Sequence, residues 1–156
     1  MDEGCYIPVG DKTAIVDKEF DYLAKYKWRI ANKWYAGTWM MIDGKKTFIL
    51  MHRLVLGCGC SSSTDHINGN GLDNRKVNLR ACKNSENLRN RKIHKNNKCG
   101  FKGVYWEEER KLWVVSLRLN NKHIFAGRFK DIRDAARAYN NKAVELFGEF
   151  ARLNVL

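Results

Sequence analysis

The sequence predicts an α+β protein with two modules. Residues 1–92 alternate short strand-like runs with turn residues and end in a strand, a loop, a strand and a helix. Residues 101–156 combine three strand-like runs with one long amphipathic helix. The length of 156 residues suits one ordinary domain or two small ones, and an apolar content of 44% is enough for globular cores.

The first part of the N-terminal module is predicted to be β-rich. Asp43-Gly44 separates two apolar runs, and this dipeptide is a strong signal for a two-residue hairpin turn. A further turn is expected at Gly10-Asp11. The expected elements are two strands within residues 5–17, a short helix at 20–28, strands at 34–42 and 46–51, a helix or strand end at 52–56, and a loop at 57–64.

The second part of this module is predicted to fold as strand, loop, strand and helix. Its loop is rich in asparagine and glycine, which favour turns. The first strand is expected to end at 65–67, the loop to span 68–74, the second strand to span 77–82, and Asn84 or Ser85 to cap a helix that runs to about Arg91.

The C-terminal module is expected to follow a polar, basic linker at residues 93–100. Its apolar residues alternate along the central strand and recur with a 3.6-residue period along the helix. The predicted elements are strands at 103–106, 112–119 and 122–129, with a turn at Asn120-Asn121, and a helix capped by Asp131 and ended by Gly148.

The charge of the chain favours a polyanionic partner such as nucleic acid. There are 29 Lys and Arg residues against 17 Asp and Glu, a net charge of +12. The net charge is +1 over residues 1–51, +7 over 52–100 and +4 over 101–156. A merely solvated basic surface is the alternative interpretation, but the excess is greatest where the candidate chemistry lies.

The five cysteines are odd in number and scattered, which argues against a disulfide framework. A zinc site requires two close pairs, and only Cys58-x-Cys60 is close, so we expect reduced thiols and no zinc. The apolar runs are too short to span a membrane. The acidic, polar N-terminus lacks the features of a signal peptide, so we expect a cytoplasmic protein that is not secreted.

Asp65, His66, Asn78 and Asn87 are the best candidates for catalytic chemistry. A strand-loop-strand-helix unit can bring the end of its first strand against its helix, where Asp65 and Asn87 could share one cation. Two oxygen ligands with open positions suit Mg²⁺. His66 could then take a proton from water, with Asn78 bonded to the other ring nitrogen. The alternative is an ordinary loop carboxylate beside a surface histidine, with asparagines that serve only the turns.

These residues resemble the HNH nuclease family, in its phage and homing-endonuclease branch. The resemblance runs through residues 52–55, 65–70, 74–75, 77–80 and 85–90, and the N-terminal stretches 14–17 and 27–28 also look like those of the phage proteins. It implies a ββα-metal fold with its core at 52–92, and hydrolysis of DNA phosphodiester bonds. It also implies that Asp65 and Asn87 hold Mg²⁺ or Mn²⁺, that His66 is the general base and that Asn78 orients His66. It leaves the role of His52 open.

Other chemistries fit the sequence poorly. An EF-hand loop that began at Asp65 would place Ile67 and Gly69 where oxygen ligands are needed. The chain has neither a P-loop nor a Gly-x-Ser-x-Gly nucleophile elbow.

Residues 101–154 resemble the plant ethylene-response-factor DNA-binding domain, which also occurs attached to phage HNH nucleases. The matching stretches are 103–104, 111–115, 126–129, 134–139, Gly148 and 153–154. The resemblance implies a three-stranded antiparallel sheet that lies in the major groove and is backed by the helix. One departure is Glu107-Glu108-Glu109, which occupies a turn that is usually basic in that family.

Double-stranded DNA is the expected partner of both modules. A solvated sheet face remains the alternative for the C-terminal module. The residues expected to contact DNA are Arg53, Arg75 and Arg80 in the first module, and Lys102, Tyr105, Arg110, Ser116, Arg118, His123, Phe125 and Arg128 in the second.

The sequence therefore predicts a metal-dependent DNA endonuclease of phage or homing type. Because each chain has one candidate site and no coiled-coil heptads, we expect a monomer that mainly nicks. The alternative is a catalytically silent DNA-binding regulator. An RNA-binding protein is a third possibility, but the usual clamp motifs are missing.

Overall fold

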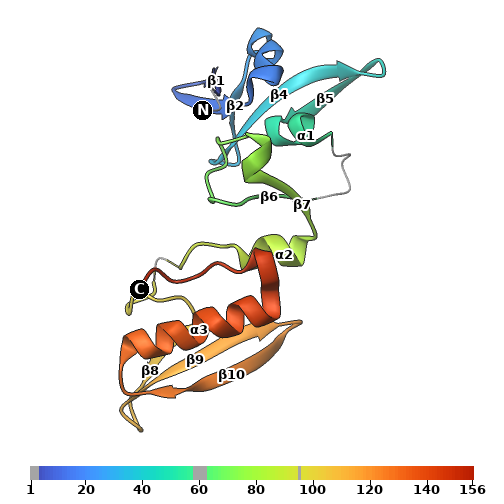
Figure 1. Cartoon of the computed structure of the whole chain (residues 1–156). Coiled ribbons are helices and arrows are strands. Elements are labelled where there is room, and N and C mark those ends of the chain that lie inside the picture. Colours follow the sequence, from blue (N-terminus) through green and yellow to red (C-terminus); the bar gives the residue numbers. More distant parts are fainter. Residues whose placement is uncertain (1–3, 58–62, 95) are drawn as a thin grey trace. The chain divides into compact units, whose positions relative to one another are not determined.

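The structure is a computed structural model that describes residues 4–57, 63–94 and 96–156. Within these residues, ten strands form four small antiparallel sheets accompanied by three α-helices (Figure 1). The protein is therefore α+β, as predicted. It divides into two compact units, residues 1–87 and 88–156. Part of the predicted 57–64 loop, with Cys58 and Cys60, lies outside the described residues.

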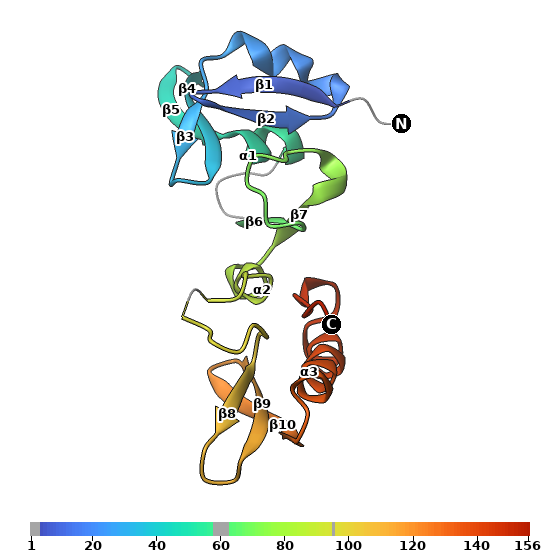
Figure 2. The same ribbon diagram turned by 90° about the vertical axis from the view of Figure 1, so that its left-hand side faces the viewer.

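The first unit begins with the predicted hairpin of β1 (Cys5–Val9) and β2 (Lys12–Val16), which pair side by side (Figure 2). Alternate residues of both strands are buried, which is the period of a half-buried sheet. The buried residues are Ile7, Val9, Ala14 and Val16.

The helix predicted at 20–28 is instead a 3-10 helix, η1 (Lys18–Lys25), with non-helical backbone angles at Phe20. Phe20 and Leu23 are its buried residues. Their spacing of three matches the three residues per turn of a 3-10 helix, so a short, tight turn buries both. The sequence prediction was wrong here because it extended the helix through Trp28.

The second sheet contains β3 (Arg29–Ala31), β4 (Tyr35–Ile42) and β5 (Lys45–Leu50). The predicted hairpin turn at Asp43-Gly44 is confirmed, and both residues have the positive φ of a type I′ turn. The short strand β3 was not predicted, since three residues are too few to show an alternating pattern.

The chain then forms α1 (Met51–Leu56), β6 (Ser63–His66), η2 (Lys76–Asn78), β7 (Leu79–Cys82) and α2 (Asn84–Arg89). Strand, loop, strand and helix follow in the predicted order, but α2 ends two residues earlier than expected. Asn84 is its first helical residue rather than its cap, and the Lys83 N–H donates to the Glu86 carboxylate there.

The N-terminal hairpin is hydrogen-bonded to the 68–74 loop, and both lie over the core of the first unit. The Ile15 amide donates to the Leu72 carbonyl at 2.9 Å, and the Asn74 amide donates to the Ile15 carbonyl at 2.8 Å. The apolar side chains that pack beneath include Val16, Met51 and Leu79. The β1–β2 hairpin therefore fixes the loop that follows β6.

The second unit contains β8 (Val104–Glu107), β9 (Leu112–Leu119) and β10 (Lys122–Phe129) in the order β10-β9-β8, with α3 (Ile132–Phe147) along one face (Figure 1). The Asp131 carboxylate caps α3 by accepting from the Arg133 and Asp134 amides. The strands, the turn at Asn120-Asn121 and the caps are as predicted. A short 3-10 helix, η3 (Gly148–Phe150), follows α3.

Asn154 joins the C-terminal tail to the start of this unit. Its side-chain oxygen accepts from the Lys102 amide at 2.6 Å, and its side-chain nitrogen donates to the Lys102 carbonyl at 3.1 Å. Its backbone pairs with the Asn140 side chain through bonds of 2.7 and 2.9 Å. Within the described part of the chain, no helix is both long and apolar enough to cross a membrane.

Gly103 should be essential for packing of the second unit. Its φ of +71° suits glycine, and a Cβ there would lie 2.3 Å from the Tyr139 ring. Gly103→Ala should therefore lower the free energy of unfolding by more than the 1–2 kcal/mol, roughly, of left-handed backbone strain alone. The matched control is Gly100→Ala, because Gly100 has a φ of +79° but open space around it. Equal urea midpoints for the two variants would contradict this.

Candidate active site

Asp65 and His66 end strand β6 and are both buried, at 3% and 5% exposure. Consecutive strand residues point to opposite faces, so the two side chains leave the hairpin on different sides. Asp65 lies opposite Arg80 and His66 lies opposite Leu79 in the β6–β7 register. The hairpin therefore presents a carboxylate on one face and an imidazole on the other.

The Asp65 carboxylate is bound by Arg80 across the hairpin. Its Oδ2 accepts from Arg80 Nε at 2.9 Å and from Arg80 Nη2 at 2.6 Å. Both side chains are largely buried. Arg80 was predicted to contact DNA, and the structure instead places its guanidinium on Asp65, because the register makes the two direct neighbours.

The His66 ring is held by Asn74. The Asn74 Oδ1 lies 3.3 Å from His66 Nε2, and Asn74 is fully buried, at 0% exposure. The Asn74 side-chain nitrogen donates to the Leu72 carbonyl at 3.2 Å, which leaves its oxygen directed at the ring. The residue that orients His66 is therefore Asn74.

Asn78, which was predicted to orient His66, braces the loop instead. Its Oδ1 accepts from the Asn68 amide at 3.0 Å, and its Nδ2 donates to the Asp73 carbonyl at 2.7 Å. Asn78 lies in η2, before β7 begins, so its side chain crosses the loop rather than reaching the ring. It shapes the loop that carries Asn74.

The predicted DNA contact Arg75 is paired within the same loop. Its Nε and Nη2 donate to the two Asp73 oxygens, both at 2.8 Å. This pairing is the main reason that the pKa of Asp73 is lowered. The Arg75 side chain remains one-third exposed, so it still has access to solvent.

His52 and Tyr35 enclose the His66 ring. The ring centroids of His52 and His66 are 5.1 Å apart in an edge-to-face arrangement, and Tyr35 lies 5.2 Å from His52 and 5.6 Å from His66. Burial is the main cause that lowers the pKa of both histidines, that of His52 to about 3. Both rings are therefore neutral at pH 7. The predicted DNA contact Arg53 neighbours His52 on α1, is half-buried, and its charge also lowers the pKa of His52.

The first unit should lose stability in acid because of His52. The unfolded chain binds a proton at His52 below about pH 6.5, whereas the folded chain does so only near pH 3. The free energy of unfolding is therefore unaffected by His52 above pH 6.5. Between pH 6.5 and about pH 3 it falls by roughly 1.4 kcal/mol for each pH unit. Urea midpoints at pH 7 and 4.5 should differ less in His52→Gln than in the parent. An equal difference would contradict the prediction.

Asn87, the second predicted metal ligand, and Asp65 both lie near the Cys82 thiol. Cys82 lies two residues after Arg80 on the same face of β7. The Asn87 backbone N–H donates to the Lys83 carbonyl at 3.1 Å and lies near the Cys82 thiol. Burial raises the pKa of Cys82, and the charge of Asp65 raises it further. Among the described residues no group of three or more His, Cys, Asp or Glu is arranged to hold a metal ion. Asp65 and Asn87 together offer a carboxylate and an amide oxygen, which are hard donors that suit Mg²⁺.

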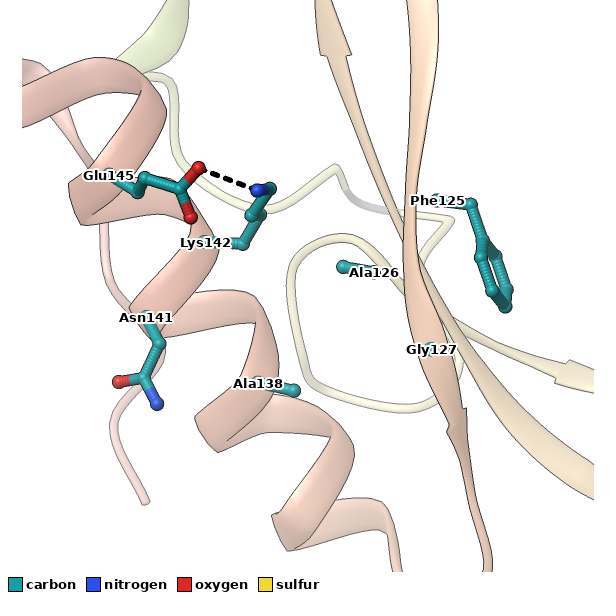
Figure 3. A pocket seen from close by; sticks show the side chains of 7 residues that line it. All are labelled: Phe125, Ala126, Gly127, Ala138, Asn141, Lys142 and Glu145. Atoms are coloured by element: carbon teal, nitrogen blue, oxygen red, sulfur yellow. Dashed lines mark hydrogen bonds and ion pairs between the residues drawn. The ribbon is translucent and has the colours of Figure 1, made fainter.

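The structure gathers six of the predicted DNA contacts on the face of the β8–β9–β10 sheet away from α3. Residues opposite one another in the register share a face. Figure 3 shows Phe125 on the side of β10 away from α3, whereas Ala126 faces the hollow beside α3. The gathered residues are Tyr105, Ser116, Arg118, His123, Phe125 and Arg128.

Two other predicted contacts of this unit have different surroundings. The Lys102 ammonium donates to the carbonyls of Arg89 and Arg91 at 2.6 and 2.8 Å, and burial lowers its pKa to about 8. Lys102 lies just before β8, and its ammonium connects the start of the sheet to residues 89–91. This ammonium was predicted to contact DNA and is instead bonded within the unit. Arg110 lies in the β8–β9 turn and pairs with Glu107, as Arg128 also does.

The chain is similar to a curated phage protein. Protein 3.8 of Escherichia phage T7 is 37% identical over 89 residues, which are 56% of this chain and 72% of that protein. The chain belongs to the family of phage T7 Protein 3.8. No protein-family model matches the chain, and no solved structure matches it.

In this member of the Protein 3.8 family, sequence reasoning missed two residues of the site. Asn74 was attributed to turn chemistry, and Tyr35 was assigned only to a strand. The available signal was the dipeptide Asn74-Arg75 within the stretch that resembles HNH nucleases. For Tyr35 there was no local signal, because its contact with His66 joins residues 31 positions apart.

Proposed function

We propose that this Protein 3.8 relative is an HNH-type endonuclease that hydrolyses phosphodiester bonds of double-stranded DNA. The observation that carries the proposal is the His66 ring, which is buried, neutral and held through Nε2 by Asn74. A neutral imidazole fixed in one orientation is what a general base requires.

The tautomer follows from the partner of the ring. The Asn74 oxygen can only accept, so Nε2 carries the proton and the lone pair lies on Nδ1. Nδ1 is then the atom that would take a proton from the attacking water. Tyr35 and His52 limit the rotation of the ring, so the lone pair keeps its direction.

Asp65 and Asn87 are the residues that would hold Mg²⁺ or Mn²⁺. Such an ion, when bound, stabilises the charge that develops on the phosphate and on the leaving oxygen. The Arg80 guanidinium already pairs with Asp65, so it competes with a metal ion for this carboxylate. Metal binding there requires Arg80 to give up at least part of this pairing.

The exposed sheet face of the second unit supports binding to double-stranded DNA. Arg118, His123 and Ser116 offer hydrogen-bonding groups, while Tyr105 and Phe125 offer aromatic surface. Such a face suits contacts with base edges and phosphates. The Arg128–Glu107 ion pair lies at the same face, so Arg128 would have to exchange a carboxylate for a phosphate.

The test is nicking of supercoiled plasmid with and without EDTA. We expect open circles to accumulate before linear DNA in Mg²⁺ or Mn²⁺, because one site on a monomer attacks one strand at a time, and no reaction in EDTA. Failure to nick with either metal, together with retained DNA binding, would replace this proposal with a catalytically silent regulator. The phage relative makes the host cytoplasm the proposed place of action.

A further inference from the structure

An exposed aromatic and basic surface covers one face of the β3–β4–β5 sheet. Ala36 on β4 is buried in the core of the first unit, so its neighbours Tyr35 and Gly37 lie on the opposite face. Trp39 and Met41 continue this opposite face, at 49% and 67% exposure. We call this face the β4 stripe. It comprises Arg29, Tyr35, Gly37, Trp39, Met41, Lys46 and Phe48.

The apolar members of the β4 stripe are packed against one another rather than scattered. Trp39 and Phe48 are direct cross-strand neighbours, with ring centroids 5.3 Å apart. Gly37 leaves room for the Phe48 ring, since a Cβ at this position would lie 2.4 Å from it. The glycine thus lets the Phe48 ring lie close to β4 while it remains 39% exposed.

The charges around the stripe are mostly positive. Residues 27–50 contain five basic residues and one acidic residue, whereas residues 1–26 contain three basic and six acidic residues. Arg29 lies opposite Gly37, and Lys46 lies opposite Met41 with its ammonium 5.8 Å from the Trp39 ring. The near-neutral charge of the first 51 residues therefore combines an acidic segment, residues 1–26, with a basic segment, residues 27–50, that contains this sheet.

The stripe is continuous with the candidate active site. Tyr35 belongs to the stripe, and its ring lies 5.6 Å from that of His66. Trp39 lies four residues further along a regular strand, about 13 Å from Tyr35 at roughly 3.3 Å per residue. A polymer bound along β4 would therefore pass from Trp39 to His66 within the first unit.

We propose that the β4 stripe binds an unpaired DNA strand, with bases stacked on Trp39 and Phe48 and phosphates bound by Arg29 and Lys46. Exposed aromatic rings flanked by cations are the usual chemistry of single-strand binding, because any base can stack on them. This site is separate from the sheet face of the second unit. This inference rests on the proposed nuclease function and adds to it that the strand which reaches His66 is unpaired or distorted.

The test measures binding of a fluorescein-labelled oligothymidylate of twelve nucleotides to the full chain by fluorescence polarisation. EDTA is present throughout, so the measurement does not depend on cleavage. Trp39→Ala should weaken binding about tenfold or more, since one base–aromatic stack contributes on the order of 1–3 kcal/mol. Tyr22→Ala is the matched control, because Tyr22 is also 49% exposed but lies in the acidic half. It should leave binding unchanged.

Two further variants exclude a folding artefact. Met41→Glu puts a negative charge at the exposed end of the stripe without emptying any packed site, and it should also weaken binding. Arg29→Gln combined with Lys46→Gln should reduce the slope of log affinity against log salt by about 0.7 for each phosphate that the variant no longer neutralises. Melting curves of all variants should match that of the parent.

The inference is overturned if Trp39→Ala and Met41→Glu bind oligothymidylate as tightly as the parent. It is also overturned if the parent forms a dimer in sedimentation that Trp39→Ala dissolves while oligothymidylate affinity is unchanged, which would make the stripe an interface between copies. Oligothymidylate binding that depends on Trp39 in a protein that never nicks plasmid would support the inference and reject the nuclease proposal.

Discussion

His66→Ala should reduce plasmid nicking by a factor of about 10² to 10⁴, the usual contribution of a positioned general base. The ring is buried, neutral and oriented by Asn74, and alanine has no atom that can accept the proton. Affinity for the same DNA, measured in EDTA, should change little because a buried imidazole is not a phosphate clamp.

The control for this experiment is His66→Gln. Glutamine fills more of the space between Tyr35 and His52 and can still donate to Asn74, but it is not a base. It should be as inactive as the alanine variant and more stable than it. Nicking by either variant at the rate of the parent would remove His66 from the proposed mechanism.

Asp65→Asn should abolish nicking or raise the Mg²⁺ concentration that it needs by at least tenfold. The amide keeps the shape of the carboxylate but loses the negative charge that attracts a divalent cation. It also leaves the guanidinium of Arg80 largely buried without its anion, and loss of one partner of a buried pair typically costs about 3–5 kcal/mol. A loss of activity in this variant therefore has two possible sources.

The double variant Asp65→Asn with Arg80→Met separates these sources. It removes both charges, so most of the stability should return while nicking should not. In Arg80→Met alone the Asp65 carboxylate loses its competing cation, and Mg²⁺ should raise the melting temperature more than it does in the parent. No difference between the Mg²⁺-induced shifts of the two proteins would place the metal elsewhere.

The sequence predicted the second unit more accurately than the first. Its three strands and α3 have long periodic patterns, and the cap at Asp131 and the turn at Asn120-Asn121 are short-range features. The first unit consists of strands of three to eight residues, in which periodicity is weak. The strand β3 was missed for this reason, whereas the helix predicted at 20–28 is a 3-10 helix that ends at Lys25.

Local patterns in the sequence were enough to predict the α+β class, the order of strand, loop, strand and helix, and the residue types of the candidate site. Asp65 and His66 are adjacent, so their placement at the end of one strand followed from local pattern alone. The groups that contact these two side chains could be identified only in the folded structure. Arg80 reaches Asp65 through the β6–β7 register, and Asn74 reaches His66 because the β1–β2 hairpin fixes the loop. Such contacts depend on the packing of distant segments, which a local sequence pattern does not contain.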